Sequence, residues 1–430
     1  MIIHIVKPGE TLNSIAELYN ISAERLMLEN DIDTFDELAI GQSLVILFPK
    51  DVYIVQSGDT LYSIAKKNNL SVIELLRNNP YLSDRRTLLE GESLVIQYES
   101  DRYYSISTAG YVFPYIDRDV LRKTLPFLTY MTVFNYNVTI DGDVVGDNDA
   151  DIIELAKSYK VAPLMFVSTM TLRGIKSEDI AFKIINNTEI QYKIIQNVIT
   201  ILKRSGYYGV NILINALNAS TIDKLLDFLS EASKAYHSEG FRVVATVTPE
   251  YGTDSNGIVF NEIDYSRLLP YVDAIVFTTY EWGRTYGCPS PLAPINVLQA
   301  LLDYAVKLVP ASKISLGLIP IGYDWPIPYI QGYTQANAVT MKNAIQIAIE
   351  NDIPIQYSEV AKAPYFFYMS DSLHIVWFKD ARTFSAFSDL VLEFSIQGIS
   401  TWTIMNYNAQ LWQILNNRFY IENVYDAIIE

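Results

Sequence analysis

The chain opens with a segment that is followed by an approximate copy of itself. Residues 6–16 (VKPGETLNSIA) and 55–65 (VQSGDTLYSIA) are identical at seven of eleven positions. Further along each copy, residues 38–46 (LAIGQSLVI) and 88–96 (LLEGESLVI) are identical at six of nine. A repeat of this length is one supersecondary unit used twice. The repeat therefore predicts two small modules at the start of the chain and a separate fold after them.

Both copies predict the element order strand, helix, helix, strand. Thr11 and Thr60 stand just before apolar helical runs, in the position where a hydroxyl caps the first turn of a helix. We place the first module at residues 1–49 and the second at residues 50–98.

The repeated pattern V-x-x-G-D-T-L-x-x-I-A, with an asparagine in the second helix and G-Q-x-L-x-I after it, resembles the LysM module over residues 2–48 and 52–97. LysM modules bind N-acetylglucosamine-containing polymers in a groove between two loops. The resemblance assigns these loops to residues 9–12 with 38–41 and to residues 58–61 with 88–91. The implied sugar contacts are Gly9, Glu10, Thr11, Leu12, Gly58, Asp59, Thr60 and Leu61.

The pattern changes after residue 101, where short β-rich runs alternate with amphipathic helical stretches. This alternation is typical of βα units and a parallel sheet. About 300 residues suit a (β/α)8 TIM barrel at 101–430, with a small α+β insertion at about 326–382. The predicted strands cover residues 127–136, 163–168, 209–215, 242–248, 274–279, 313–320 and 398–404.

A TIM barrel carries its site at the carboxyl ends of its strands. The run GYYGVNILIN at 206–215 is predicted to be a buried strand. It resembles the fourth strand of family 18 glycoside hydrolases, whose signature is D-G-x-D-x-D-x-E. The four acidic positions of the signature fall on Tyr208, Asn211, Leu213 and Asn215, and none of these is a carboxylate.

Other strand ends also resemble family 18. Residues 276–283 (VFTTYEWG) are similar to the sixth strand, whose tyrosine and carboxylate contact the N-acetyl group of the sugar. Residues 313–325 resemble the seventh strand with an aromatic and acidic rim, and residues 398–402 resemble the last strand, whose tryptophan lies under the sugar. The implied sugar-binding residues of the cleft are Tyr280, Glu281, Trp282, Asp324, Trp325 and Trp402.

The order of these motifs resembles a subgroup of the family, the spore cortex-lytic N-acetylglucosaminidases of endospore formers. In family 18 the substrate's own acetamide is the nucleophile. One glutamate protonates the leaving oxygen, and an aspartate two residues earlier orients the acetamide. Asn215 and Leu213 stand at these positions. Because general acid catalysis alone contributes about 10²–10⁴-fold, we expect no catalytic residue in this strand.

Three functions remain open. The first is a peptidoglycan-binding, spore-associated protein whose barrel is inactive. The second is an active N-acetylglucosaminidase that uses a displaced acid, for which Glu250, Glu281 and Asp324 are the candidates. The third is a structural coat protein that binds no sugar. The expected partners are N-acetylglucosamine-containing glycans and spore coat or cortex proteins.

Composition excludes several other classes. The formal charge of −17 argues against a nucleic-acid partner. His4, His237 and His374 have no ligand spacing, so we expect no metal and no cofactor. The single cysteine, Cys288, allows no intrachain disulfide and is predicted to be a packed loop thiol.

The sequence also predicts where the protein is found. No stretch approaches 18 consecutive apolar residues, so we expect no membrane span. The start MIIHIVKP has neither a basic leader nor an apolar region before a cleavage site. We therefore expect synthesis in the cytoplasm and association with the spore coat or cortex.

Overall fold

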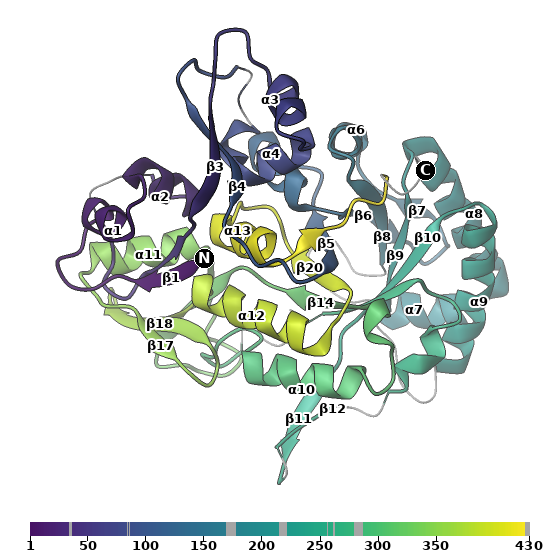
Figure 1. Cartoon of the computed structure of the whole chain (residues 1–430). Helices are drawn as coiled ribbons and strands as arrows, with labels where there is room; N and C mark the ends of the chain where they lie inside the picture. The colour runs from purple at the N-terminus through teal and green to yellow at the C-terminus, as the bar shows by residue number, and fades with distance from the viewer. Residues whose placement is uncertain are drawn as a thin grey trace.

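The computed structural model describes residues 1–33, 37–83, 85, 87–168, 178–214, 222–255, 257–260, 263–278 and 287–425. Figure 1 shows two small modules, drawn in purple and dark blue, beside a larger barrel. A second, smaller sheet, drawn in light green, lies under the first module.

The two modules have the predicted order of elements. The first contains β1 (Ile2–Ile5), α1 (Leu12–Tyr19), α2 (Ala23–Glu29) and β2 (Ser43–Ile46). The second contains β3 (Pro49–Ile54), α3 (Leu61–Lys67), α4 (Val72–Asn78), the short η1 (Pro80–Leu82) and β4 (Ser93–Tyr98). In each module the outer strands pair antiparallel, β1 with β2 and β3 with β4.

The first helix of each module begins with the predicted threonine cap. The Thr11 hydroxyl accepts from the Ser14 backbone N–H at 3.1 Å, and the Ser14 hydroxyl oxygen accepts from the Thr11 N–H at 2.9 Å. Thr60 and Ser63 repeat this exchange at 3.0 Å in both directions. Each exchange satisfies two backbone donors at the start of the helix.

Eight parallel strands close into a barrel, which confirms the predicted fold class. Each strand pairs with the next, and β20 returns to β5 with Gly398 opposite Ser107 and Trp402 opposite Tyr111. The strands are β5 (Ser105–Val112), β6 (Tyr130–Val138), β8 (Ala162–Ser168), β9 (Gly209–Ile214), β10 (Arg242–Val247), β13 (Ala274–Phe277), β14 (Ile314–Leu318) and β20 (Gly398–Trp402).

Helices and short segments surround the barrel (Figure 1). The helices are α5 (Arg118–Thr124), α6 (Ala150–Ser158), α7 (Glu178–Ile185), α8 (Thr188–Ser205), α9 (Ile222–Ser238), α10 (Ile295–Ala305), α12 (Ala381–Phe394) and α13 (Ala409–Arg418). The 3₁₀ turns are η2 (Leu125–Phe127), η3 (Tyr265–Leu268) and η4 (Ala311–Lys313), and the short strands are β7 (Val144–Val145), β11 (Tyr251–Asp254), β12 (Gly257–Phe260) and β21 (Tyr420–Ile421). None of the helices in the described ranges is long and apolar enough to span a membrane.

The insertion is a five-stranded antiparallel sheet with one helix, and its order is β16-β15-β19-β18-β17. Its elements are β15 (Gly322–Ile327), β16 (Asn337–Val339), α11 (Met341–Glu350), β17 (Gln356–Ser358), β18 (Ala363–Met369) and β19 (Leu373–Trp377). The sheet thus begins at Gly322, before the predicted residue 326.

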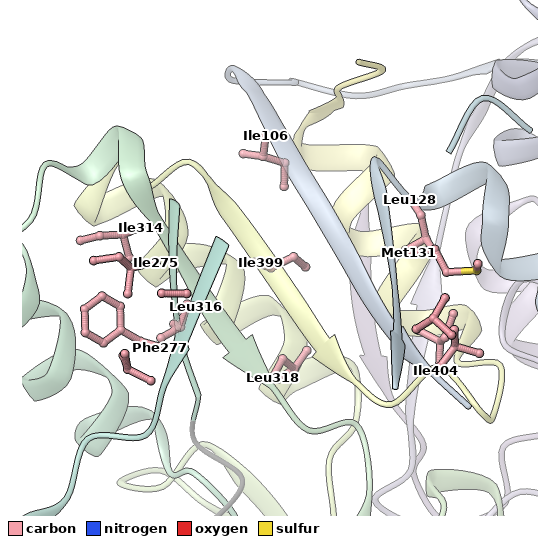
Figure 2. Close-up of a cluster of buried hydrophobic side chains, with 14 of the residues drawn as sticks. Ile106, Leu128, Met131, Ile275, Phe277, Ile314, Leu316, Leu318, Ile399 and Ile404 are labelled. Carbon is pink, nitrogen blue, oxygen red and sulfur yellow. The ribbon is translucent and has the colours of Figure 1, made fainter. Parts of the chain in front are cut away.

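The main core lies between the strands and the helices. Figure 2 shows Ile275, Phe277 and Leu316 among its buried side chains. This core also contains Val45 of the first module and Val95 of the second. The modules are therefore packed onto the barrel by a shared apolar core and are not merely tethered to it.

Candidate functional site

The interior of the barrel is neutral where the family 18 signature is acidic. Asn211 on β9 is 1% exposed. Its Oδ1 accepts from the Thr246 hydroxyl at 2.7 Å, and its Nδ2 donates to the Tyr111 hydroxyl at 3.0 Å. The two hydroxyls lie 2.9 Å apart, and burial raises the pKa of Tyr111 to about 12. Each end of the amide therefore has an uncharged hydrogen-bond partner.

An aromatic cluster lies at the carboxyl ends of the barrel strands. Its buried members are Tyr111, Phe134 and Phe166, with Leu213 and Trp402 packed against them. The Trp402 ring centroid lies 5.2 Å from that of Tyr111 and 5.3 Å from that of Phe134. Trp402 consequently faces the barrel interior, where a partly exposed ring can lie against the apolar face of a sugar. Its contact with a sugar stays a prediction.

Leu213 places an apolar side chain beside this cluster, at a position where the family 18 signature has a carboxylate. It follows Asn211 on the inward face of β9, while the alternate residues Val210 and Ile214 belong to the outer core. The third signature carboxylate is thus replaced by an apolar side chain against aromatic rings. Leu213 can neither orient an acetamide nor balance a positive charge.

Several predicted site residues lie outside the described residues. They are Asn215, Tyr280, Glu281 and Trp282. Glu250 is described and is exposed just after β10.

Asp324 and Trp325 do not have the predicted positions on the rim of the barrel. Both belong to β15, which is part of the insertion sheet. Trp325 is fully buried and donates from Nε1 to the Gly287 carbonyl at 3.1 Å. No face of its indole is therefore exposed to a sugar.

The Asp324 carboxylate is likewise used inside the insertion. Its two oxygens contact Nδ1 of His374 at 2.8 Å and the hydroxyl of Tyr368 at 2.7 Å. Burial, followed by the hydrogen bond to Asp324, raises the pKa of Tyr368. Asp324 is 5% exposed, so it does not present an acid to the barrel mouth.

The acidic residues of the LysM loops stabilise the loops themselves. Glu10 accepts from the Lys7 backbone N–H at 2.7 Å and lies 2.9 Å from Nε2 of His4. Asp59 accepts from the Gln56 backbone N–H at 2.8 Å and from the Tyr53 hydroxyl at 2.9 Å. The backbone donors lower the pKa of both carboxylates.

The first loop of each module, residues 9–12 and residues 58–61, also presents backbone and hydroxyl groups to solvent. Gly9, Thr11, Gly58 and Thr60 are exposed in the two modules. Leu12 is buried and Leu61 is half-buried, and each packs in the apolar core of its own module.

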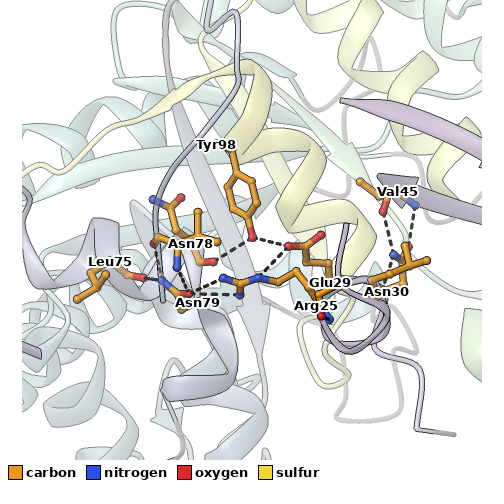
Figure 3. Close-up of polar contacts among 11 residues, drawn as sticks. Arg25, Glu29, Asn30, Val45, Leu75, Asn78, Asn79 and Tyr98 are labelled. Carbon is orange, nitrogen blue, oxygen red and sulfur yellow. Dashed lines mark hydrogen bonds and ion pairs between the residues drawn. The ribbon is translucent and has the colours of Figure 1, made fainter. Parts of the chain in front are cut away.

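A polar contact between the modules was not predicted from the sequence. Figure 3 shows Arg25 reaching Oδ1 of Asn79 at 3.2 Å, while Tyr98 donates to Glu29 at 2.6 Å. Asn79 also donates to the Val95 carbonyl at 2.7 Å and accepts from its N–H at 2.9 Å. Asn79 corresponds to Asn30 in the repeat. Each of these asparagines hydrogen-bonds the last strand of its own module from the end of the second helix, and this repeated asparagine is the feature by which the sequence could have indicated the role of Asn79.

The structure also describes the cysteine and acidic residues. Cys288 is exposed, which corrects the prediction of a packed thiol. Among the residues with described positions, no group of three His, Cys, Asp or Glu side chains could hold a metal ion.

The fold and its motifs define a class of protein. Residues 167–406 match glycosyl hydrolases family 18, and residues 4–47 and 53–97 match the LysM domain. The chain therefore belongs to family 18, in the branch that carries two LysM domains before the barrel.

Particular relatives resemble the chain over nearly its whole length. It is 30% identical to the cortical fragment-lytic enzyme of Bacillus subtilis (strain 168), covering 97% of this chain and 98% of the relative. The crystal structure of the Bacillus cereus spore cortex-lytic enzyme SleL matches with a TM-score of 0.80 and 29% identity, covering 98% of this chain and 99% of that one. A chitinase from Chromobacterium violaceum, at 23% identity and a TM-score of 0.65, covers 73% of this chain and 98% of its own and shares the fold.

Proposed function

We propose that the chain is a spore-associated, peptidoglycan-binding protein whose family 18 barrel does not hydrolyse glycans. The observation that carries this proposal is the inward face of β9. There a neutral Asn211 is satisfied by hydroxyl groups, and Leu213 packs against aromatic rings. Neither position supplies the carboxylate that the reaction of family 18 requires.

The side chains at the carboxyl ends of the barrel strands support binding better than catalysis. An aromatic floor with Trp402 at the strand ends provides apolar surface for a sugar ring. Asp324, one candidate for a displaced acid, has both carboxylate oxygens hydrogen-bonded, one to His374 and one to Tyr368. The similarity to proteins named as cortex-lytic enzymes favours cortex peptidoglycan as the glycan and the spore as the location.

Two measurements on the full-length chain test the proposal. Co-sedimentation with purified insoluble peptidoglycan should remove the protein from the supernatant. Incubation with cortex fragments should release no reducing ends, while a cortical fragment-lytic enzyme assayed in parallel releases them. Binding without hydrolysis is the expected outcome.

Other outcomes identify the rival functions. Hydrolysis that is abolished by Glu281→Gln or by Glu250→Gln would establish an active N-acetylglucosaminidase with a displaced acid. Absence of both binding and hydrolysis would favour a structural coat protein.

A further inference from the structure

The two LysM modules differ in the second loop of the groove. In the first module this loop touches the insertion of the barrel. Ile355 of the insertion donates its backbone N–H to the Ile40 carbonyl at 2.8 Å, and Arg382 of the barrel helix α12 donates from Nη2 to the Gly41 carbonyl at 3.2 Å. A Cβ atom at Gly41 would lie 2.1 Å from the Ile355 carbonyl oxygen. The backbone of the insertion therefore lies directly on this loop.

The contact of the first module extends into the core of the insertion. Ala39 is 4% exposed and packs in one cluster with Ala344, Phe366 and Val376. The Ala39 N–H donates to Oε1 of Gln42 at 3.1 Å, and the equivalent Leu89 N–H of the second module donates to Oε2 of Glu92 at 3.3 Å, so this bond does not distinguish the two modules. What distinguishes the first module is that the insertion packs against this side of its second loop.

The corresponding loop of the second module is open. Leu89, which corresponds to Ala39 in the repeat, is 59% exposed. Gly91 corresponds to Gly41 and has almost the same φ, +84° against +83°. A Cβ atom at Gly91 would meet no described atom beyond its chain neighbours within 4 Å. The insertion thus covers this loop in one module and leaves it free in the other.

The first loops do not share this difference. A Cβ atom at Gly9 or at Gly58 would likewise meet no described atom beyond its chain neighbours within 4 Å. The second module also carries Tyr62, 65% exposed in the first turn of α3, where the first module has Asn13. An exposed aromatic ring beside a loop of this kind suits stacking on a sugar.

We propose that the second module supplies the glycan-binding groove, and that the first module is a docking element that fixes the insertion to the barrel. This inference rests on the proposed function, because it assigns the peptidoglycan binding to one of the two modules. It names Leu89 and Tyr62 as residues that contact an N-acetylglucosamine-containing chain.

The test compares matched pairs of substitutions in the full-length protein. The first variant, Tyr62→Ala with Leu89→Asp, alters the second module. The second variant, Asn13→Ala with Ile40→Asp, alters two exposed side chains of the first module, one at the position of Tyr62 and one a single residue after the buried equivalent of Leu89. Unchanged circular dichroism and melting temperature establish that each variant is folded.

Binding is measured by co-sedimentation with purified insoluble peptidoglycan over a range of peptidoglycan concentrations. The second-module variant should bind about fivefold more weakly, which corresponds to about 1 kcal/mol, because it loses an exposed aromatic ring and an exposed apolar side chain. The first-module variant should stay within about twofold of wild type. Equal losses in the two variants, or no loss in the second-module variant, would overturn the assignment alone. A wild-type chain that stays in the supernatant would overturn the proposed function together with this assignment.

Discussion

The Thr246 hydroxyl on β10 donates a 2.7 Å hydrogen bond to Oδ1 of Asn211 on β9, in the centre of the barrel. Tyr111 completes the group from β5, so three neutral side chains from three strands satisfy one another. The geometry suits an amide, because one end of the side chain accepts and the other donates. A carboxylate at this position would have the hydroxyl groups of Thr246 and Tyr111 as its neighbours, and neither of them carries a positive charge.

Asn211→Asp should therefore destabilise the protein. The variant places a carboxylate 1% exposed among hydroxyl and aromatic groups, and we expect a loss of at least about 3 kcal/mol at pH 7. The loss should shrink at pH 5, where the raised pKa of the buried acid lets it protonate. Urea unfolding at both pH values measures this, with the exposed Asn343→Asp as control. Equal stability of the two variants at pH 7 would show that the barrel interior accepts a charged side chain at residue 211, which contradicts this prediction.

The modules and most barrel strands could be predicted because their signals are local. The repeat places Thr11 and Thr60 at helix starts, and each capping exchange involves residues three apart. The first barrel strand, β5, was missed. Its sequence SISTAGYV is rich in small and hydroxyl residues, so it lacks the apolar run that marks a buried strand, although six of its eight residues are buried.

The errors at the site have a topological cause. Only three residues separate β14 from β15, and the Pro320 among them does not show that the next strand leaves the barrel, so Asp324 and Trp325 were assigned to the barrel rim. The contact between Ile355 and Ile40 could not be predicted either. It joins two backbones that are far apart in the chain, and backbone contacts leave no residue pattern.

Restoring the signature carboxylates tests whether the barrel has lost only its acids. Asn215→Glu alone should release no reducing ends from cortex fragments, because Leu213 leaves the acetamide unoriented. Leu213→Asp alone should cost about 2–3 kcal/mol of stability, since it places a carboxylate against Phe134 and Phe166. The two changes together should give slow but detectable release. Release by wild type equal to that of the double variant would show that β9 does not limit activity.

The docking of the first module can be measured with two glycines. Gly41 and Gly91 have φ values of +83° and +84°, so alanine imposes the same backbone strain of about 1 kcal/mol at both positions. Only Gly41→Ala also forces a Cβ against the Ile355 carbonyl oxygen. We expect Gly41→Ala to lose at least about 2 kcal/mol more than Gly91→Ala in urea unfolding. Limited proteolysis should also cut Gly41→Ala faster near the insertion, and indistinguishable variants would refute the docking.

The contact between the modules should weaken as pH rises. Glu29 is 2% exposed, and burial raises its pKa from 4.5 to about 7, against the opposing effects of Arg25 and Tyr98. Its Oε2 has no hydrogen-bond partner among the described residues, which fits a preference for the protonated form. The folded chain therefore binds this proton more tightly than the unfolded chain.

The sign of the pH dependence follows from this raised pKa. The contribution of the Glu29 proton to the free energy of unfolding is fully present below pH 4.5. It is lost as pH rises through about 7, by about 3 kcal/mol in total. Glu29→Gln keeps the shape of the side chain and removes the titration, so the stability of wild type relative to this variant should fall by that amount between pH 4.5 and pH 8. Urea unfolding of both proteins across this range measures the difference, with Glu24→Gln on the exposed face of α2 as control. A difference that stays constant with pH would show that folding does not raise the pKa of Glu29, because the charge of Arg25 at 3.6 Å offsets the burial.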